Sequence, residues 1–230
     1  MVSPLLLFAA LPLAFVAYSP ASHLLPFATR RGPANRRAIA LTFDDGPDPI
    51  WTPRVLDILD RHGARGTFFL VGMRARTFPD VTREIIEAGH EIGAHGFRHR
   101  NLWLCPPGET REEIRRGVEV LEELTGRSVQ HFRPPWGMMN LSVYPWVARL
   151  GLRCVLWSIQ PEGLRPWAPE RQAAHVLRQA HPGAIVDLHD APGLPGAPAR
   201  TLAALPAILD GLREAGYALV SLSALLGVDP

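Results

Sequence analysis

The chain has 230 residues, of which 47% are hydrophobic and 20% charged, so it can bury one large core. This composition excludes a disordered chain, a collagen-like fibre and a miniprotein held together by disulfides. The 24 basic residues nearly balance the 22 acidic ones, and a net charge of only +2 argues against nucleic acid as a partner. Every basic residue is an arginine, which excludes chemistry that needs a lysine. Cys105 and Cys154 predict two buried thiols, with one disulfide as the alternative.

Residues 1–28 form a hydrophobic segment, and residues 2–18 carry no charged side chain. The apolar stretch is short for a membrane span and long for the core of a signal peptide. Pro4 and Pro12 disfavour a buried helix. We therefore expect a membrane anchor or a cleaved signal, a basic linker over residues 29–37 and a folded domain over residues 38–230. The protein would then be membrane-associated or secreted and extracytoplasmic, although the arginines of the linker favour the opposite orientation.

From Ala38 onward, short apolar runs alternate with helical patterns. The predicted strands are Ala38–Phe43, Gly66–Val71, Glu91–His95, Val129–Phe132, Arg153–Ile159, Ala184–Leu188 and Ala218–Leu222. Helical patterns open at Thr52, with Pro53 at the first helical position, and at Thr110, where Glu113 completes a capping box. Further helices are predicted at Pro79–Gly89, Leu141–Leu150, Pro169–Ala180 and Thr201–Ala215. Strands joined through helices pair in parallel, so the sequence predicts an α/β fold, either an open sheet or a barrel.

Polar residues gather where four of the predicted strands end. These clusters are Asp44 with Asp45, His95 with His99, Arg133 to Trp136, and His189 with Asp190. The C-terminal ends of parallel strands lie on one face of an α/β fold, where ligands bind. Four clusters at such ends therefore predict a single site.

Asp45, His95 and His99 offer one carboxylate and two imidazoles, a donor set that suits zinc or another divalent transition ion. Three protein ligands leave coordination positions open, which is typical of a catalytic metal. The alternatives are two structural histidines and, for the Asp-Asp-Gly-Pro run, a plain turn. The second carboxylate, Asp44, could then accept a proton from water that the ion activates.

Four segments in order resemble the motifs of the polysaccharide deacetylases, carbohydrate esterase family 4, which share the NodB homology domain. They are Thr42-Phe43-Asp44-Asp45-Gly46-Pro47, His95-Gly96-Phe97-Arg98-His99, Arg133-Pro134-Pro135-Trp136-Gly137 and Leu188-His189-Asp190. The resemblance extends over residues 38–222. It implies a distorted (β/α) barrel of about seven parallel strands, with the active site at their C-terminal ends. It also implies a metal-dependent hydrolase that removes N-acyl groups, usually acetyl, from amino sugars.

Carried over residue by residue, the resemblance implies that Asp44 is the general base and that Arg133 orients it. His189 would be the general acid, and the backbone N–H of Trp136 would help to hold the oxyanion. The implied metal ligands are Asp45, His95 and His99. Zinc is the first choice of ion, with Co²⁺, Mn²⁺ or Ni²⁺ as alternatives.

Two positions depart from the family pattern. Gln160 stands where the family usually has an aspartate that supports the general-acid histidine, and Asp187 stands where a leucine usually lines the acyl pocket. We expect Asp187 and Leu188 among the residues that face the substrate. Side chains two apart on a strand share a face, so the simplest hypothesis is that Asp187 supplies the missing carboxylate by pairing with His189 or Arg133. The alternative is that Asp187 caps a turn or contacts surface arginines.

The first functional hypothesis is therefore a metal-dependent N-deacylase of an N-acetylated glycan. A deformylase or deacylase of a lipid-linked amino sugar is the alternative that the hydrophobic N-terminus favours. A catalytically silent glycan-binding domain is the alternative from another class. The expected partners are an N-acylated glycan and, through the N-terminal segment, a membrane.

Overall fold

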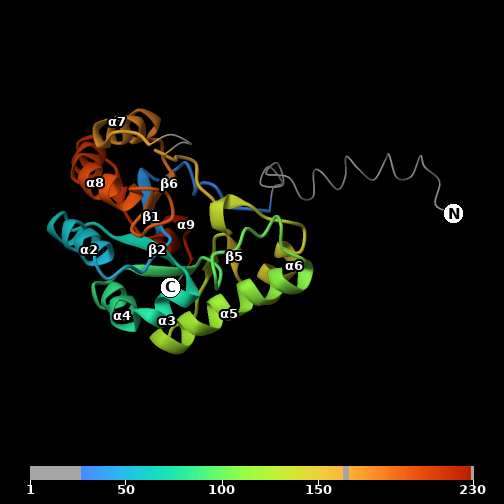
Figure 1. Cartoon of the computed structure of the whole chain (residues 1–230). Helices are drawn as coiled ribbons and strands as arrows, with labels where there is room; N and C mark the ends of the chain where they lie inside the picture. The colour runs from blue at the N-terminus through green and yellow to red at the C-terminus, as the bar shows by residue number, and fades with distance from the viewer. Residues whose placement is uncertain (1–26, 163–165, 229–230) are drawn as a thin grey trace.

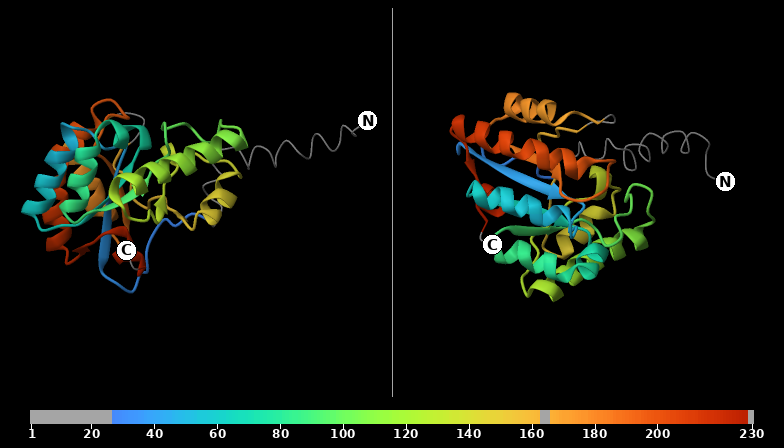
Figure 2. Two further views of the ribbon diagram at one scale, coloured as in Figure 1. Left: turned by 90° about the horizontal axis from the view of Figure 1, so that it is seen from below. Right: turned by 60° about the vertical axis from the view of Figure 1, so that its left-hand side comes forward.

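The computed structural model describes residues 27–162 and 166–228, and helices surround one parallel sheet (Figure 1). The strands are β1 (Ala38–Asp44), β2 (Gly66–Leu70), β3 (Glu91–Ala94), β4 (His131–Phe132), β5 (Arg153–Cys154), β6 (Ile185–His189) and β7 (Ala218–Leu219). The helices are α2 (Trp51–Arg61), α3 (Gly72–Thr77), α4 (Pro79–Glu87), α5 (Pro107–Thr125), α6 (Val143–Arg149), α7 (Pro169–Gln179), α8 (Ala197–Glu214) and α9 (Leu222–Leu226), with a 3₁₀ turn η2 (Pro135–Gly137). Six of the seven strands are ordered β5-β4-β3-β2-β1-β6, and the seventh, β7, pairs with the start of β1. Two further views show the helices around the outside of the sheet (Figure 2).

The sheet curls into a distorted barrel, which confirms the predicted fold class. The chain beyond β5 reaches β6, where Ile159 makes an isolated parallel bridge with Val186. The segment before β1 lies between β5 and β6. Thr29 makes a bridge with Val155, just after β5, and Arg31 makes a bridge with Ala184, just before β6. Part of the expected basic linker therefore packs into the barrel wall. The insertion also explains why regular pairing in β5 ends well before Ile159, where the sequence predicted that the strand would end.

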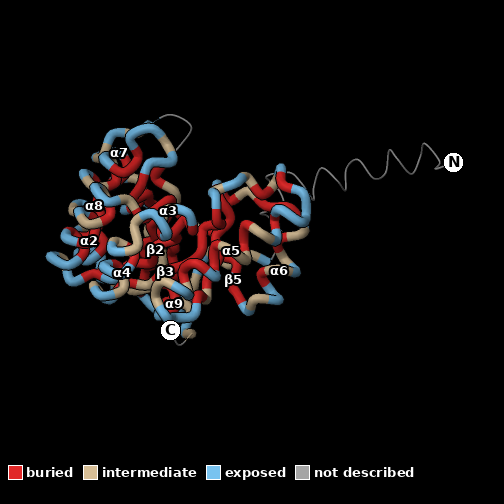
Figure 3. The backbone as a smooth tube through the Cα atoms, turned by 60° about the horizontal axis from the view of Figure 1, so that its bottom comes forward, coloured by how far each residue is buried: buried red, intermediate tan, exposed pale blue. Residues whose placement is uncertain are grey.

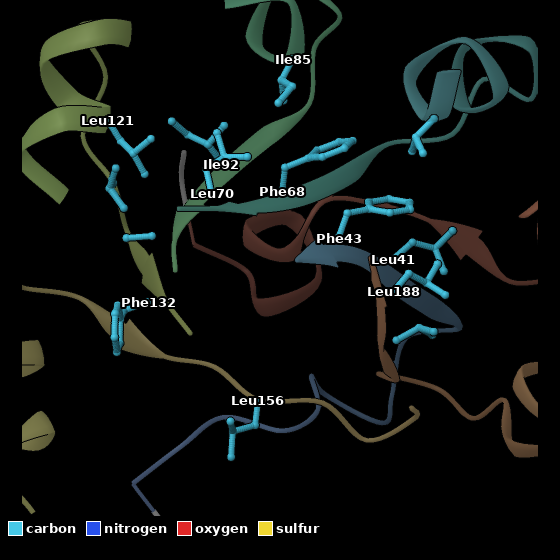
Figure 4. Packing of buried hydrophobic residues seen from close by; sticks show 14 of the residues in the cluster. Leu41, Phe43, Phe68, Leu70, Ile85, Ile92, Leu121, Phe132, Leu156 and Leu188 are labelled. Carbon is cyan, nitrogen blue, oxygen red and sulfur yellow. The ribbon is translucent and has the colours of Figure 1, made fainter. Parts of the chain in front are cut away.

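Side chains alternate between the inside of the barrel and the layer under the helices. Phe43 of β1 packs outward and stacks on Phe68 of β2 at 4.8 Å between ring centroids. Leu41 and Leu188 lie in the same outer cluster (Figure 4). Buried residues occupy the middle of the molecule, and exposed ones follow the outer helices (Figure 3). This alternation leaves the even-numbered residues of β1 to face the barrel interior.

The C-terminal segment closes the barrel at the end opposite the site. The last predicted strand was expected to reach Leu222, but β7 stops at Leu219 and α9 begins at Leu222. The cause is local, since the Ser221 side chain caps α9 by accepting the N–H of Ala224. Leu222 and Leu225 then pack with Phe69 in a small buried cluster inside the barrel.

The capping box predicted at Thr110 is wrong. Helix α5 begins earlier, at Pro107, whose fixed φ suits the first helical position. Thr110 lies inside the helix and Glu113 is buried, where its carboxylate accepts backbone N–H groups of the loop after β3. Glu113 thus fixes the loop that carries His99, rather than the end of its own helix.

Most of the hydrophobic segment 1–28 lies outside the described residues, so the membrane and localisation predictions stay predictions. No helix in the described ranges is long and apolar enough to cross a membrane. Cys105 and Cys154 are both buried free thiols, as the sequence predicted first.

Candidate active site

The ends of β1, β3, β4 and β6 bring the predicted polar clusters together on one face. Asp45 Oδ1 lies 2.9 Å from His99 Nε2 and 3.5 Å from His95 Nε2. Asp44 Oδ2 lies 3.6 Å from His95 Nε2, and His189 Nε2 lies 4.0 Å from Asp45 Oδ2. Residues from separate parts of the chain therefore form one cluster around Asp45.

The donor atoms of Asp45, His95 and His99 all lie within 4.8 Å of one another. His95 Nδ1 is 2.8 Å from the carbonyl oxygen of Arg133, so this nitrogen carries the proton and Nε2 keeps its lone pair toward Asp45. Burial would raise the pKa of Asp45, but the hydrogen bonds of His95 and His99 hold it well below its usual range. An ionised carboxylate with two imidazoles fits a divalent ion, and these residues could hold one.

Backbone strain is concentrated in the same place. Asp45, His99 and Trp136 have φ values of 74°, 58° and 55°, and they are the non-glycine residues with positive φ in the described chain. Such a conformation costs about 1–3 kcal/mol at each residue and persists only where surrounding contacts enforce it. The strain indicates that the surrounding contacts hold these side chains in the positions that the site needs, at the cost of an unfavourable backbone conformation.

Arg133 is fully buried and organises the interior of the barrel beneath the cluster. Its Nη1 donates to Asp44 Oδ1 at 2.6 Å, to Thr42 Oγ1 at 2.8 Å and to Asp187 Oδ1 at 3.2 Å. Its Nη2 donates to the carbonyl of Leu156 at 3.2 Å. Because Arg133 engages Oδ1, the second oxygen of Asp44 is left facing the donor cluster.

The carboxylate beside His189 belongs to Glu162, which the sequence reasoning missed. Glu162 Oε2 lies 3.1 Å from His189 Nδ1, at ion-pair distance although without hydrogen-bond geometry, and Glu162 is buried. Burial would lower the pKa of His189, but Glu162 and the carboxylates of Asp187 and Asp45 raise it to about 10. His189 is therefore protonated at neutral pH, with Nε2 turned toward the cluster.

The hypothesis that Asp187 supports His189 is corrected in part. Asp187 pairs with Arg133, one of the two expected partners, and its other oxygen accepts a hydrogen bond from Gln160 at 3.2 Å. Burial, together with the nearby charge of Asp44, raises the pKa of Asp187. The direct partner of His189 is Glu162 instead, because that carboxylate reaches Nδ1 from the segment after β5.

Of the two other residues expected at the site, Trp136 borders it and Leu188 does not. Trp136 is 49% exposed, and its ring centroid is 4.2 Å from that of His99, so it borders the site. Leu188 was expected to face the substrate, but its side chain is buried in the outer core cluster. Strand alternation is the reason, since Asp187 and His189 occupy the inner face of β6.

Gly193, in the loop after β6, packs against Asp45 more closely than any side chain would allow. A methyl group at this position would overlap the Asp45 carboxylate. We expect Gly193→Ala to weaken binding of a divalent ion, with zinc as the probe, about tenfold, because changes to the residues that hold a metal ligand in place typically cost 10–100-fold in affinity. Competition with a chelating dye measures this, and Gly108→Ala, where nothing lies within 4 Å, is the matched control. Unchanged zinc affinity in Gly193→Ala would show that the loop does not constrain Asp45.

Known proteins resemble this chain along most of its length. A family model described as polysaccharide deacetylase matches residues 31–155. A chitooligosaccharide deacetylase of Azorhizobium caulinodans is 38% identical over 196 residues, which cover 80% of this chain and 92% of the relative. A peptidoglycan-N-acetylglucosamine deacetylase of Bacillus cereus is 36% identical over 203 residues, which cover 87% and 93%.

Solved structures agree with these matches. The Bc1960 peptidoglycan N-acetylglucosamine deacetylase has a TM-score of 0.83 and 32% identity, and the match covers 88% of this chain and 94% of that one. A CE4 family pseudoenzyme from Bacillus anthracis has a TM-score of 0.79 and 27% identity, with 88% and 70% covered. The family model covers more than half of the chain, and the matches with the two relatives cover nearly all of each relative's length. This chain therefore belongs to the polysaccharide deacetylase family.

Proposed function

We propose that this chain is a metal-dependent hydrolase that removes N-acyl groups, acetyl in first place, from an amino-sugar-containing glycan. One observation carries the proposal: the Asp44 carboxylate lies 3.6 Å from His95 and the His189 imidazole 4.0 Å from Asp45, so both border the Asp45–His95–His99 cluster. Amide hydrolysis needs both groups, because water must lose a proton and the departing amine must gain one.

Each residue has a distinct task in this reaction. Asp44 accepts the proton of the attacking water through the oxygen that Arg133 leaves free. Arg133 keeps that carboxylate oriented through its hydrogen bond to Oδ1. His189 donates its Nε2 proton to the amine, and Glu162 stabilises the imidazolium from the Nδ1 side. When bound, a divalent ion supplies polarisation of the acyl oxygen and lowers the pKa of water.

Zinc is the ion we propose, because one carboxylate and two imidazoles with open positions are typical of catalytic zinc. N-acetylglucosamine in a chitooligosaccharide or in peptidoglycan is the substrate that the names of the relatives support. Because one structural relative is a pseudoenzyme, the test must also distinguish an active enzyme from a catalytically silent glycan-binding domain.

Acyl release from defined substrates tests the proposal. The full chain, loaded with zinc, is incubated with N-acetylated chitooligosaccharides, peptidoglycan fragments and a lipid-linked N-formyl amino sugar, with and without chelator. We expect acetate from one of the first two, with activity lost on chelation and restored by zinc. Formate from the third alone would favour the deformylase. No acyl release from a protein that holds its metal would instead favour the glycan-binding domain.

Replacing Glu162 by glutamine tests the general acid. Removing this charge lowers the pKa of His189, so the imidazolium is lost at lower pH. We expect the alkaline limb of the pH profile of kcat/KM to move down by about one to three pH units, the usual effect of a nearby opposite charge. Glu170→Gln, an exposed position on α7, makes the same charge change and serves as the control. An unmoved alkaline limb would contradict the role of Glu162.

A further inference from the structure

A cavity beside the donor cluster contains two arginines that the proposed reaction does not use. It has a volume of about 230 Å³, and its lining includes Asp45, His99, Arg74 and Arg98. We call it the arginine cavity. A water molecule in liquid water occupies about 30 Å³, so the cavity has room for a substituent of several heavy atoms.

Arg74 is held in place by backbone groups and not by an acid. It is half-buried on α3, and its guanidinium donates to the carbonyls of Asp45 at 3.1 Å and Pro192 at 3.4 Å. Within residues 27–162 and 166–228, no carboxylate lies within ion-pair distance of it. A guanidinium has five N–H groups, so donors remain for a ligand. Arg74 is thus oriented in advance but has unused charge.

Arg98 approaches the cavity from the loop between the two ligand histidines. Its backbone N–H donates to Glu113 at 2.8 Å, which fixes the loop, while its side chain is exposed. In the described part of the chain, its guanidinium also lacks a carboxylate within ion-pair distance. Arg100, two residues later, differs because it pairs with Glu109 at 3.2 Å. Of these two loop arginines, Arg98, which lines the cavity, is therefore the one available to a ligand.

The acid that lines the cavity does not neutralise these arginines. Asp45 faces His99 at 2.9 Å and His95 at 3.5 Å, so its charge is already engaged. Arginine recognises carboxylate and phosphate through paired, charge-assisted hydrogen bonds. We infer that the arginine cavity binds an anionic substituent, a carboxylate or a phosphate, on the sugar next to the one that loses its acyl group. This inference rests on the proposed function, since it names the class of glycan that the same site accepts.

A matched set of substrates tests the inference. Tetra-N-acetylchitotetraose is compared with its C6-carboxylate and 6-O-phosphate derivatives, with the zinc-loaded full chain. We expect one or both anionic derivatives to have a kcat/KM about tenfold above the neutral oligomer, as charge-assisted hydrogen bonds predict. The advantage should shrink at about 1 M salt, where charges are screened beyond about 3 Å. The preferred derivative identifies the anion as carboxylate or phosphate.

Substitutions locate the effect. We expect Arg98→Gln and Arg74→Gln each to lower the anionic-to-neutral ratio of kcat/KM about tenfold. Arg76→Gln removes the same charge from α3 at an exposed position outside the cavity lining, and should preserve that ratio. Equal kcat/KM for all three oligomers, or a ratio that Arg98→Gln leaves unchanged, would overturn the inference.

Binding separates this inference from the proposed function. The Kd of each oligomer is measured by calorimetry on Asp44→Asn protein, which should consume the substrate at least about 100-fold more slowly than the parent. If neither these oligomers nor the peptidoglycan fragments release acetate with the parent enzyme, the proposed function fails. Tighter binding of an anionic oligomer, lost in Arg98→Gln, would still support the arginine cavity. Equal Kd values for the neutral and anionic oligomers would contradict it whatever the rates.

Discussion

Replacing His99 by alanine is expected to abolish binding of the proposed divalent ion and to lower turnover by about three orders of magnitude or more. His99 supplies one of the three clustered donor atoms, and its Nε2 is 2.9 Å from Asp45. Two remaining protein ligands bind a divalent ion weakly, and loss of the ion removes several kcal/mol of transition-state stabilisation. Metal content by elemental analysis and acetate release measure the two effects. His95→Ala should behave alike.

A control separates the loss of a ligand from the loss of any histidine. His175 lies on α7, outside the donor cluster, and His175→Ala should keep both metal and activity. Melting temperatures show whether the ligand variants remain folded, since His99 is only partly buried and makes contacts at the surface of the site. Full turnover by a preparation shown to be free of metal would refute the proposed mechanism.

The sequence predicted the cluster of Asp45, His95 and His99 because the topology of the sheet determines where these residues lie. Residues that end parallel strands must meet at one edge of the sheet, whatever the details of packing. Asp45 after β1 and His95 after β3 follow this rule, and the structure brings them within 3.5 Å. The same rule accounts for Arg133 and His189.

Residues outside strand ends could not be located in this way. Glu162 lies in an irregular stretch after β5, where no periodicity says which way a side chain points. Gly193 matters through close packing against Asp45, which depends on how two distant loops meet. Leu188 could have been assigned correctly, because its neighbours at odd positions face inward and alternation then places it outward. Leu188 was expected to face the substrate because it stands next to His189 in the motif, and that adjacency was misleading.

The Glu113 result shows how a local pattern can be overridden. Thr110 and Glu113 have the spacing of a capping box, yet Pro107 starts the helix earlier. The carboxylate of Glu113 then serves two backbone N–H groups of the loop after β3, at 3.1 Å and 2.8 Å. The sequence shows the spacing of Thr110 and Glu113, but it does not show that Glu113 is buried or that it contacts this loop.

Asp44→Asn is expected to keep its metal and to lose about 10²–10⁴-fold in kcat, the usual contribution of a general base. Asparagine has nearly the shape of aspartate but cannot take a proton from water. The fold should tolerate the change, because Arg133 would still face Asp187 at 3.2 Å and Thr42 at 2.8 Å, so its buried charge keeps a partner. Elemental analysis and initial rates measure metal content and kcat separately. Asp57→Asn, at an exposed ion pair on α2, is the matched control.

Comparing Asp44→Asn with His99→Ala distinguishes a general base from a metal ligand, which neither substitution does alone. If Asp44 were a metal ligand, Asp44→Asn would lose metal in parallel with activity, as His99→Ala should. If Asp44 only helped to hold Arg133, kcat would fall little, since Asp187 already pairs with the same guanidinium nitrogen. A variant that holds its metal, melts near the parent and turns over at least about 100-fold more slowly fits only a proton acceptor at this position. Near-normal kcat in the metal-loaded variant would instead move the base to another residue.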